Sequence, residues 1–189
     1  MSTEPLAQAF ADTRGILANV KPDQLDLATP CKSWQVRDLV NHIVSGSQWF
    51  GATVNAGKAD MPDADAMPKF ADGDFVAEFD KGVAESVAAF GKPGAQEKMV
   101  ELPFGTMPGG AFMGLAMTDT FTHGWDLAKA TGQPTDIDPA LAEQLLAGSK
   151  MAIQDAFRGD EPAPFGPEQQ APAGASAADK LAAFLGRKV

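Results

Sequence analysis

The stretch AFMGLAMTDTFTHGWDLAKA, Ala111–Ala130, has the apolar spacing of a helix, and Gly132 just beyond it is a typical helix stop. Within this helix Asp119 and His123 stand four residues apart, so both side chains project from one face, about 6 Å apart along the axis. The pair is either two ligands of one metal ion or a tolerated polar patch in a helix. Residues elsewhere in the chain are needed to distinguish these two interpretations.

Helical spacing of apolar residues continues on both sides of this segment, whereas convincing strand alternation is scarce. A short strand is predicted at Met99–Leu102, and the Asp-, Pro- and Gly-rich segment Gly57–Gly73 is expected to be a surface loop. The remaining predicted helices span residues 4–20, a segment from an N-cap at Ser33 to Ala56, then 75–90, 139–157 and 177–185. These elements predict an all-α fold.

Length and composition set the domain organisation and exclude several classes of function. The 189 residues suffice for one domain with a sizeable core, so we expect a single helical domain over residues 1–189, with residues 158–189 as a Pro/Gly-rich tail and short last helix packed on it. The net charge of −10 argues against a nucleic-acid partner. The start of the chain does not resemble a signal peptide, and no apolar run is long enough for a membrane span, so we expect a cytoplasmic protein.

The single cysteine, Cys31, excludes an intrachain disulfide and any zinc site built from cysteines. A metal ion would therefore need histidine and carboxylate ligands. Cys31 itself precedes a predicted helix, where a thiolate is favoured, so it is either a nucleophilic or redox thiol or a small buried apolar residue.

The other of the two histidines is His42, in the middle of the second predicted helix. Ser45 and Gly46 lie one turn from it and Trp49 two turns onward, so space could remain beside the imidazole. Two histidines and one carboxylate from two packed helices would form a three-ligand site with open positions, suited to Zn²⁺, Ni²⁺ or Fe²⁺. The carboxylate could be Asp119 or Asp126, and Asp126 could instead accept a hydrogen bond that orients the ring of His123.

Three blocks resemble, in order, an actinobacterial family within the DinB and mycothiol-dependent maleylpyruvate isomerase N-terminal superfamily. They are TPCKSWQVRDLVNHIVSG (29–46), DTFTHGWDLAKATGQP (119–134) and AADKLAAFLGR (177–187). The resemblance implies a DinB-like four-helix bundle with a long crossover connection and short appended helices. It also implies that His42, Asp119 and His123 are the metal ligands, because the family places a histidine on the second helix and an acidic-x-x-x-His pair on a later one.

Two departures from the isomerase argue against maleylpyruvate isomerisation itself. The carboxylate is Asp119 rather than a glutamate, and residues 158–189 are too few for the isomerase's additional C-terminal domain. We therefore expect a divalent-metal-dependent enzyme that uses a low-molecular-weight thiol, by resemblance mycothiol, for transfer to or isomerisation of a small electrophile. Zinc is the first expectation for the metal, with nickel and iron as alternatives. Ser45, Trp49 and Asp126 are candidates for the thiol pocket, and no catalytic residue is identified.

Other functions stay open on the sequence alone. A metal-bound hydroxide at the same site would give a hydrolase. The chain could also be a non-enzymatic, stress-related bundle in which a metal ion only ties helices together, or a metal-free bundle that acts by self-association. The expected partners are a small thiol and an electrophile, and homodimers fit a bundle of this kind.

Overall fold

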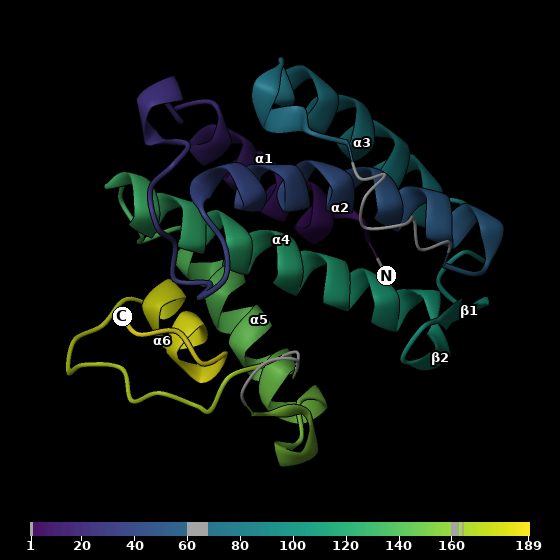
Figure 1. The fold of residues 1–189 in the computed structure, drawn as a ribbon. Coiled ribbons are helices and arrows are strands. Elements are labelled where there is room, and N and C mark those ends of the chain that lie inside the picture. Colours follow the sequence, from purple (N-terminus) through teal and green to yellow (C-terminus); the bar gives the residue numbers. More distant parts are fainter. Residues whose placement is uncertain (1, 60–67, 160–162, 164) are drawn as a thin grey trace.

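The computed structural model describes residues 2–59, 68–159, 163 and 165–189, and confirms an all-α bundle (Figure 1). Helix α2 contacts both α3 and α4, and α1 contacts α4 and α3. Helices α5 and α6 contact each other and α4, on the side of α4 away from α3 (Figure 1). The bounds are α1 Glu4–Leu17, α2 Val36–Ala56, α3 Phe75–Phe90, α4 Gly109–Thr131, α5 Pro139–Ala152 and α6 Ala177–Phe184.

The connection between α3 and α4 carries a small antiparallel hairpin. The predicted strand is β1, Met99–Leu102, and its partner β2, Gly105–Pro108, was not predicted. Met99 pairs with Pro108 and Leu102 with Gly105. The sequence GTMP of β2 has no alternation of apolar and polar residues, so periodicity could not reveal it.

Local hydrogen bonds explain where the helices begin and end. Helix α2 starts at Val36 rather than after Ser33, because Thr29 bonds to the carbonyl of Trp34 and holds the preceding residues in a turn. The carboxylate of Asp38 then accepts the Gln35 N–H at 2.9 Å. The prediction of Ser33 as N-cap was therefore wrong. Gly132 closes α4 in the left-handed conformation, as predicted.

Two predicted helices end three or more residues earlier in the structure, and the last helix ends one residue earlier, at Phe184. Helix α1 ends at Leu17, where bonds from Asn19 to Ile16 and from Val20 to Leu17 tighten the last turn. Helix α5 ends at Ala152, because Ile153 is extended, and a 3-10 turn at Asp155–Phe157 follows. Each of these turns was predicted as a continuation of the helix.

The core of the bundle is aromatic and is centred on α4. Its largest fully buried side chains include Phe10, Phe79, Phe90, Phe112, Phe121 and Trp125. Helices α2 and α3 approach closely at Gly82, where a Cβ atom would lie 2.2 Å from Ser47 Oγ. Close packing of this kind fixes the position of α2 along the bundle and therefore the position of His42.

Two further expectations concern the predicted loop before α3 and the absence of membrane spans. Residues 60–67 of the predicted loop Gly57–Gly73 lie outside the described residues, and a 3-10 turn at Phe70–Asp72 leads from the loop into α3. Among the residues that the structure describes, no helix has the length and apolar character of a membrane span.

Candidate metal centre

The structure brings together the three residues predicted as ligands. Oδ1 of Asp119 lies 3.5 Å from Nε2 of His42 and 3.5 Å from Nε2 of His123. One ligand atom from each residue lies within 4.8 Å of the other two. His42 comes from α2 and the other two from α4, and the imidazole rings meet nearly edge to face, with centroids 4.6 Å apart. We call this group the His42–Asp119–His123 cluster.

The hydrogen-bonding state of His123 explains why this cluster is suited to a cation. Asp126 Oδ2 lies 3.0 Å from Nδ1 of His123. Burial raises the pKa of Asp126, but the hydrogen bond from His123 and the charge of Arg187 outweigh burial and hold the pKa below its ordinary value. Because an ionised carboxylate can only accept, Nδ1 carries a proton, and whenever the ring is neutral it presents the lone pair of Nε2 to Asp119.

With a neutral His123 ring, two acceptors, Nε2 of His123 and Oδ1 of Asp119, face each other across 3.5 Å. This arrangement is favourable only with a cation, a proton or a metal ion, between them. A tetrahedral zinc ion at about 2.0–2.1 Å from its ligands separates neighbouring ligand atoms by roughly 3.3 Å. The spacing and the set of two imidazoles and one carboxylate thus fit Zn²⁺, and the same donors suit Ni²⁺ or Fe²⁺.

The cluster lies at the edge of the bundle, with His42 and Asp119 side chains 33% and 28% exposed and His123 12% exposed. Burial raises the pKa of Asp119, but the neighbouring charges of His42 and His123 outweigh burial and hold the pKa at about 2. Burial lowers the pKa of His42, but the charge and hydrogen bond of Asp119 together with the charge of Asp126 outweigh burial, so the net shift is upward. The carboxylate is therefore ionised at neutral pH, and the cluster is accessible from one side.

Asp126 lies behind His123 and has no exposed surface. Besides the bond from His123, it accepts from Nε and Nη2 of Arg187 at 3.2 and 3.0 Å and from Sγ of Cys31 at 3.4 Å. Asp126 thus occupies the orienting position considered from the sequence. Cys31, His123 and Asp126 also have potential ligand atoms within 4.8 Å of one another. A cation there would lie beside the Arg187 guanidinium, so we favour the His42–Asp119–His123 cluster.

Sequence reasoning missed Arg187. It follows α6 in the stretch Leu-Gly-Arg-Lys, and nothing in that local sequence distinguishes it from a surface arginine. The one signal was its inclusion in the third block of the family resemblance. Its role depends on how the tail returns to α4, across 61 residues of chain from Asp126.

The prediction of Cys31 as a residue at a helix entrance was wrong, because α2 begins five residues further on, at Val36. Burial and the negative charge of Asp126 raise the pKa of the Cys31 thiol to about 12. The thiol is therefore protonated at neutral pH and donates to Asp126. It is neither an activated nucleophile nor a purely apolar core residue.

The aromatic ring beside the cluster is that of Trp34. Its ring centroid lies 4.8 Å from that of His42 and 5.6 Å from that of His123. Trp49 packs edge-on against Phe50 and Phe112, two turns along α2 from His42. Ser45, another residue predicted for the thiol pocket, has a buried hydroxyl with no hydrogen-bond partner among the described residues. Trp34, rather than Trp49, thus covers one side of the imidazole pair.

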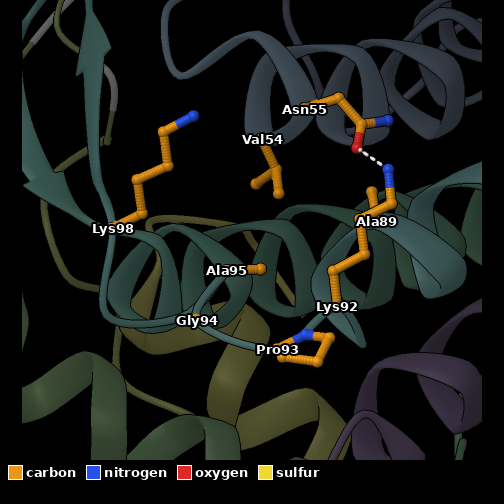
Figure 2. A pocket seen from close by; sticks show the side chains of 8 residues that line it. All are labelled: Val54, Asn55, Ala89, Lys92, Pro93, Gly94, Ala95 and Lys98. Atoms are coloured by element: carbon orange, nitrogen blue, oxygen red, sulfur yellow. Dashed lines mark hydrogen bonds between the residues drawn. The ribbon is translucent and has the colours of Figure 1, made fainter.

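A hollow of about 220 Å³ lies at a different place, where α2 and α3 end (Figure 2). Val54, Ala89 and Ala95 line it, and Nζ of Lys92 bonds to Oδ1 of Asn55 at 2.6 Å across its rim (Figure 2). Val54 is twelve residues beyond His42 on α2, roughly 18 Å along the axis. The hollow is therefore separate from the His42–Asp119–His123 cluster.

The fold and the cluster define an all-α bundle with a candidate two-histidine, one-carboxylate metal centre. Comparison with known proteins agrees: the mycothiol maleylpyruvate isomerase N-terminal domain family matches residues 6–128, a range that contains the cluster and Asp126. The chain belongs to this family, and its bundle is of the DinB-like type. It is 41% identical over 189 residues to the uncharacterised proteins MT0763 and Rv0738 of two Mycobacterium tuberculosis strains, CDC 1551 / Oshkosh and H37Rv. The similarity covers 100% of this chain and 97% of each relative. No solved structure matches.

Proposed function

We propose that the protein is a divalent-metal-dependent enzyme that uses a low-molecular-weight thiol, mycothiol, for transfer to or isomerisation of a small electrophile. The observation that carries the proposal is the convergence of two imidazole nitrogens from separate helices on one carboxylate oxygen, at 3.5 Å each. Membership of a family named for a mycothiol-dependent isomerase supports the choice of thiol.

In this proposal His42, Asp119 and His123 hold the ion, with zinc as the first expectation. A divalent ion in this cluster would lower the pKa of a small thiol from about 8.5, so that the thiolate is available near neutral pH. Three protein ligands leave a coordination position for that thiol. The thiolate sulfur would then form a C–S bond to the electrophile, while a carbon–halogen bond breaks and releases halide, an epoxide C–O bond opens and its oxygen takes up a proton, or a conjugated C=C bond takes up a proton. Isomerisation would follow if the thiol adds to a C=C bond and is eliminated again after rotation about the resulting single bond.

The surrounding side chains have separate tasks in this proposal. Asp126 fixes the tautomer of His123, so that Nε2 rather than Nδ1 faces the ion. Trp34 covers one side of the imidazole pair and excludes water there. Cys31, with its raised pKa, supplies no competing thiolate. The reacting thiol must therefore come from a second molecule.

The test begins with metal content. Protein purified without chelator should contain close to one divalent ion per chain. With mycothiol and a panel of halogenated, epoxide and unsaturated carbonyl electrophiles, the metal-loaded protein should consume thiol faster than the chelated protein. One bound ion without thiol binding or transfer would instead support the non-enzymatic bundle. Ester or amide cleavage without thiol would support the hydrolase.

A further inference from the structure

We infer that Arg187 is a positioning residue of the proposed metal centre, which holds Asp126 in the orientation that makes His123 present Nε2 to Asp119 and His42. The inference rests on the proposed function in one respect, that the cluster binds a metal ion. It adds a requirement that lies outside the family match over residues 6–128. The last residues of the chain would then set the affinity of a site built on α2 and α4.

The contacts form a continuous chain of hydrogen bonds from the tail to the cluster. Nε of Arg187 lies 3.2 Å from Oδ1 of Asp126, and Nη2 lies 3.0 Å from Oδ2. Oδ2 also accepts from Nδ1 of His123 at 3.0 Å. A guanidinium that bonds to both oxygens fixes the plane of the carboxylate, whereas a single contact would let it rotate.

Arg187 is itself held in place. Its Nη1 atom donates to the carbonyl of Leu185 at 3.1 Å, and its backbone N–H donates to the carbonyl of Ala182 at 2.9 Å. Gly186 has a φ of 95°, and a Cβ atom there would lie 2.7 Å from Cα of Gly166. Glycine at position 186 thus lets the chain reverse after α6, and the arginine side chain is only 15% exposed.

Without Arg187, His123 has an alternative hydrogen bond. If Asp126 turns away, the His123 proton can move to Nε2 and be donated to Asp119 instead. That tautomer places a proton where the ion would bind. Loss of an outer residue that orients a ligand typically weakens metal affinity by about 10–100-fold, and we expect an effect of this size.

The same tail offers a matched control in Arg158. Its Nη1 atom donates to the carbonyls of Phe184 at 2.8 Å and Gly166 at 3.2 Å, and its guanidinium lies 4.5 Å from the ring centroid of Phe184. Arg158 therefore anchors the end of α6, as Arg187 does, without contacting Asp126. Arg158→Gln should loosen the tail and leave the tautomer of His123 unchanged.

The first measurement is metal affinity, by competition between the full-length protein and a chromophoric chelator for Zn²⁺ and Co²⁺. We expect about 10–100-fold weaker binding for Arg187→Gln and a smaller loss for Arg187→Lys, which keeps the charge but not the two-point contact. Arg158→Gln should stay within about threefold of the wild type. Wild-type affinity in a folded Arg187→Gln variant, or an equal loss in Arg158→Gln, would overturn the inference.

The second measurement needs no metal. Because the chain has two histidines, nitrogen NMR of histidine-labelled, metal-free protein gives two ring systems, and His42→Gln assigns them. At a pH where the rings are neutral, wild-type His123 should show the Nδ1–H tautomer, and Arg187→Gln a mixture with Nε2–H. An unchanged tautomer refutes the inference even if the wild type binds metal. A changed tautomer supports it even if the wild type transfers no thiol, in which case only the proposed function fails.

If Arg187→Gln does not fold, as judged by circular dichroism, Arg187→Lys decides the question by the same two measurements. A partial shift toward Nε2–H with weaker metal binding supports the inference. Wild-type behaviour in both measurements would show that the two-point contact with Asp126 is not needed.

Discussion

Nε2 of His42 and Oδ1 of Asp119 lie 3.5 Å apart although 77 residues separate them in the chain. His42 belongs to α2 and Asp119 to α4, so the cluster exists only when these two helices are docked. Each prediction below depends on this docking or on the contacts that surround it.

Asp119→Asn should abolish stable metal binding. The substitution keeps the shape of the side chain but removes the only charge among the three proposed donors, which leaves two imidazoles and a weakly coordinating amide. Metal content after dialysis should fall from about one ion per chain to near zero. Asp80→Asn, which removes a surface carboxylate paired with Arg14, is the control and should retain the ion. Equal metal content in both variants would rule out Asp119 as a ligand.

Asp126→Ala should strongly destabilise the metal-free protein. Removal of this carboxylate leaves the mostly buried guanidinium of Arg187 unpaired, and breaking a buried ion pair from one side typically costs about 3–5 kcal/mol. Urea unfolding followed by circular dichroism measures the change. Asp80→Ala removes one partner of an exposed pair and should cost much less. A loss for Asp126→Ala no larger than for Asp80→Ala would contradict the prediction.

The stability of the metal-free protein and its metal affinity should respond oppositely to pH. The folded pKa of His42 is raised above its ordinary value of 6.5. The resulting stabilisation is complete below 6.5 and is lost as the pH rises through the higher folded pKa. Metal affinity should increase over the same interval, because the ring must lose its proton to bind. Urea midpoints and chelator competition between pH 6 and pH 9 test both trends, and His42→Gln should flatten them.

Cys31 should react slowly with alkylating reagents in the folded protein. Burial and the negative charge of Asp126 raise its pKa from an ordinary 9.0 to about 12, so at pH 8 the thiolate fraction falls on the order of a thousandfold. Iodoacetamide labelling followed by mass spectrometry should be slow in buffer and fast in urea. Rapid labelling of the folded protein would show that the contacts with Asp126 and Arg187 do not restrain the thiol.

Two glycine substitutions should have opposite effects on stability. Gly82→Ala places a Cβ atom 2.2 Å from Ser47 Oγ and 2.8 Å from the backbone nitrogen of Gln48, so α2 and α3 must separate. Overpacking of this kind costs about 1–3 kcal/mol. At Gly148 in α5, a Cβ atom meets nothing within 4 Å, so Gly148→Ala should add about 0.5–1 kcal/mol through helix propensity. Thermal unfolding measures both, and a neutral Gly82→Ala would refute the close approach.

Apolar periodicity predicted the long helices well because each buries one continuous face. The bounds of α3 agree at both ends, Phe75 and Phe90, since Asp74 supplies a capping side chain and Gly91 follows. Apolar periodicity predicted the ends of α1 and α5 less well, because a tighter turn continues the same apolar spacing there, as far as Val20 and Phe157. There the backbone pairing changes while the side-chain pattern does not.

The part of the candidate site that comes from residues close together in the sequence could be predicted. Asp119 and His123 share a helix face by spacing alone, whereas His42 was a candidate as the other histidine of the chain and was assigned as a ligand through the family resemblance. The contact of Arg187 with Asp126 requires the tail to fold back over α4, and no periodicity in the chain encodes that path. The turn that brings Trp34 against the imidazoles depends in the same way on hydrogen bonds of Thr29.

The position of Trp34 beside the His42–Asp119–His123 cluster should make its fluorescence sensitive to a bound ion. An excited indole in contact with an imidazole loses emission when the ring becomes cationic, and loses it again to an open-shell ion bound at that ring. At a pH where the His42 ring is neutral, Trp34, with its ring centroid 4.8 Å from that of His42, should lose emission on addition of Co²⁺ or Ni²⁺ and change little with closed-shell Zn²⁺. The protein therefore carries an intrinsic fluorophore that reports which kind of ion it has taken up.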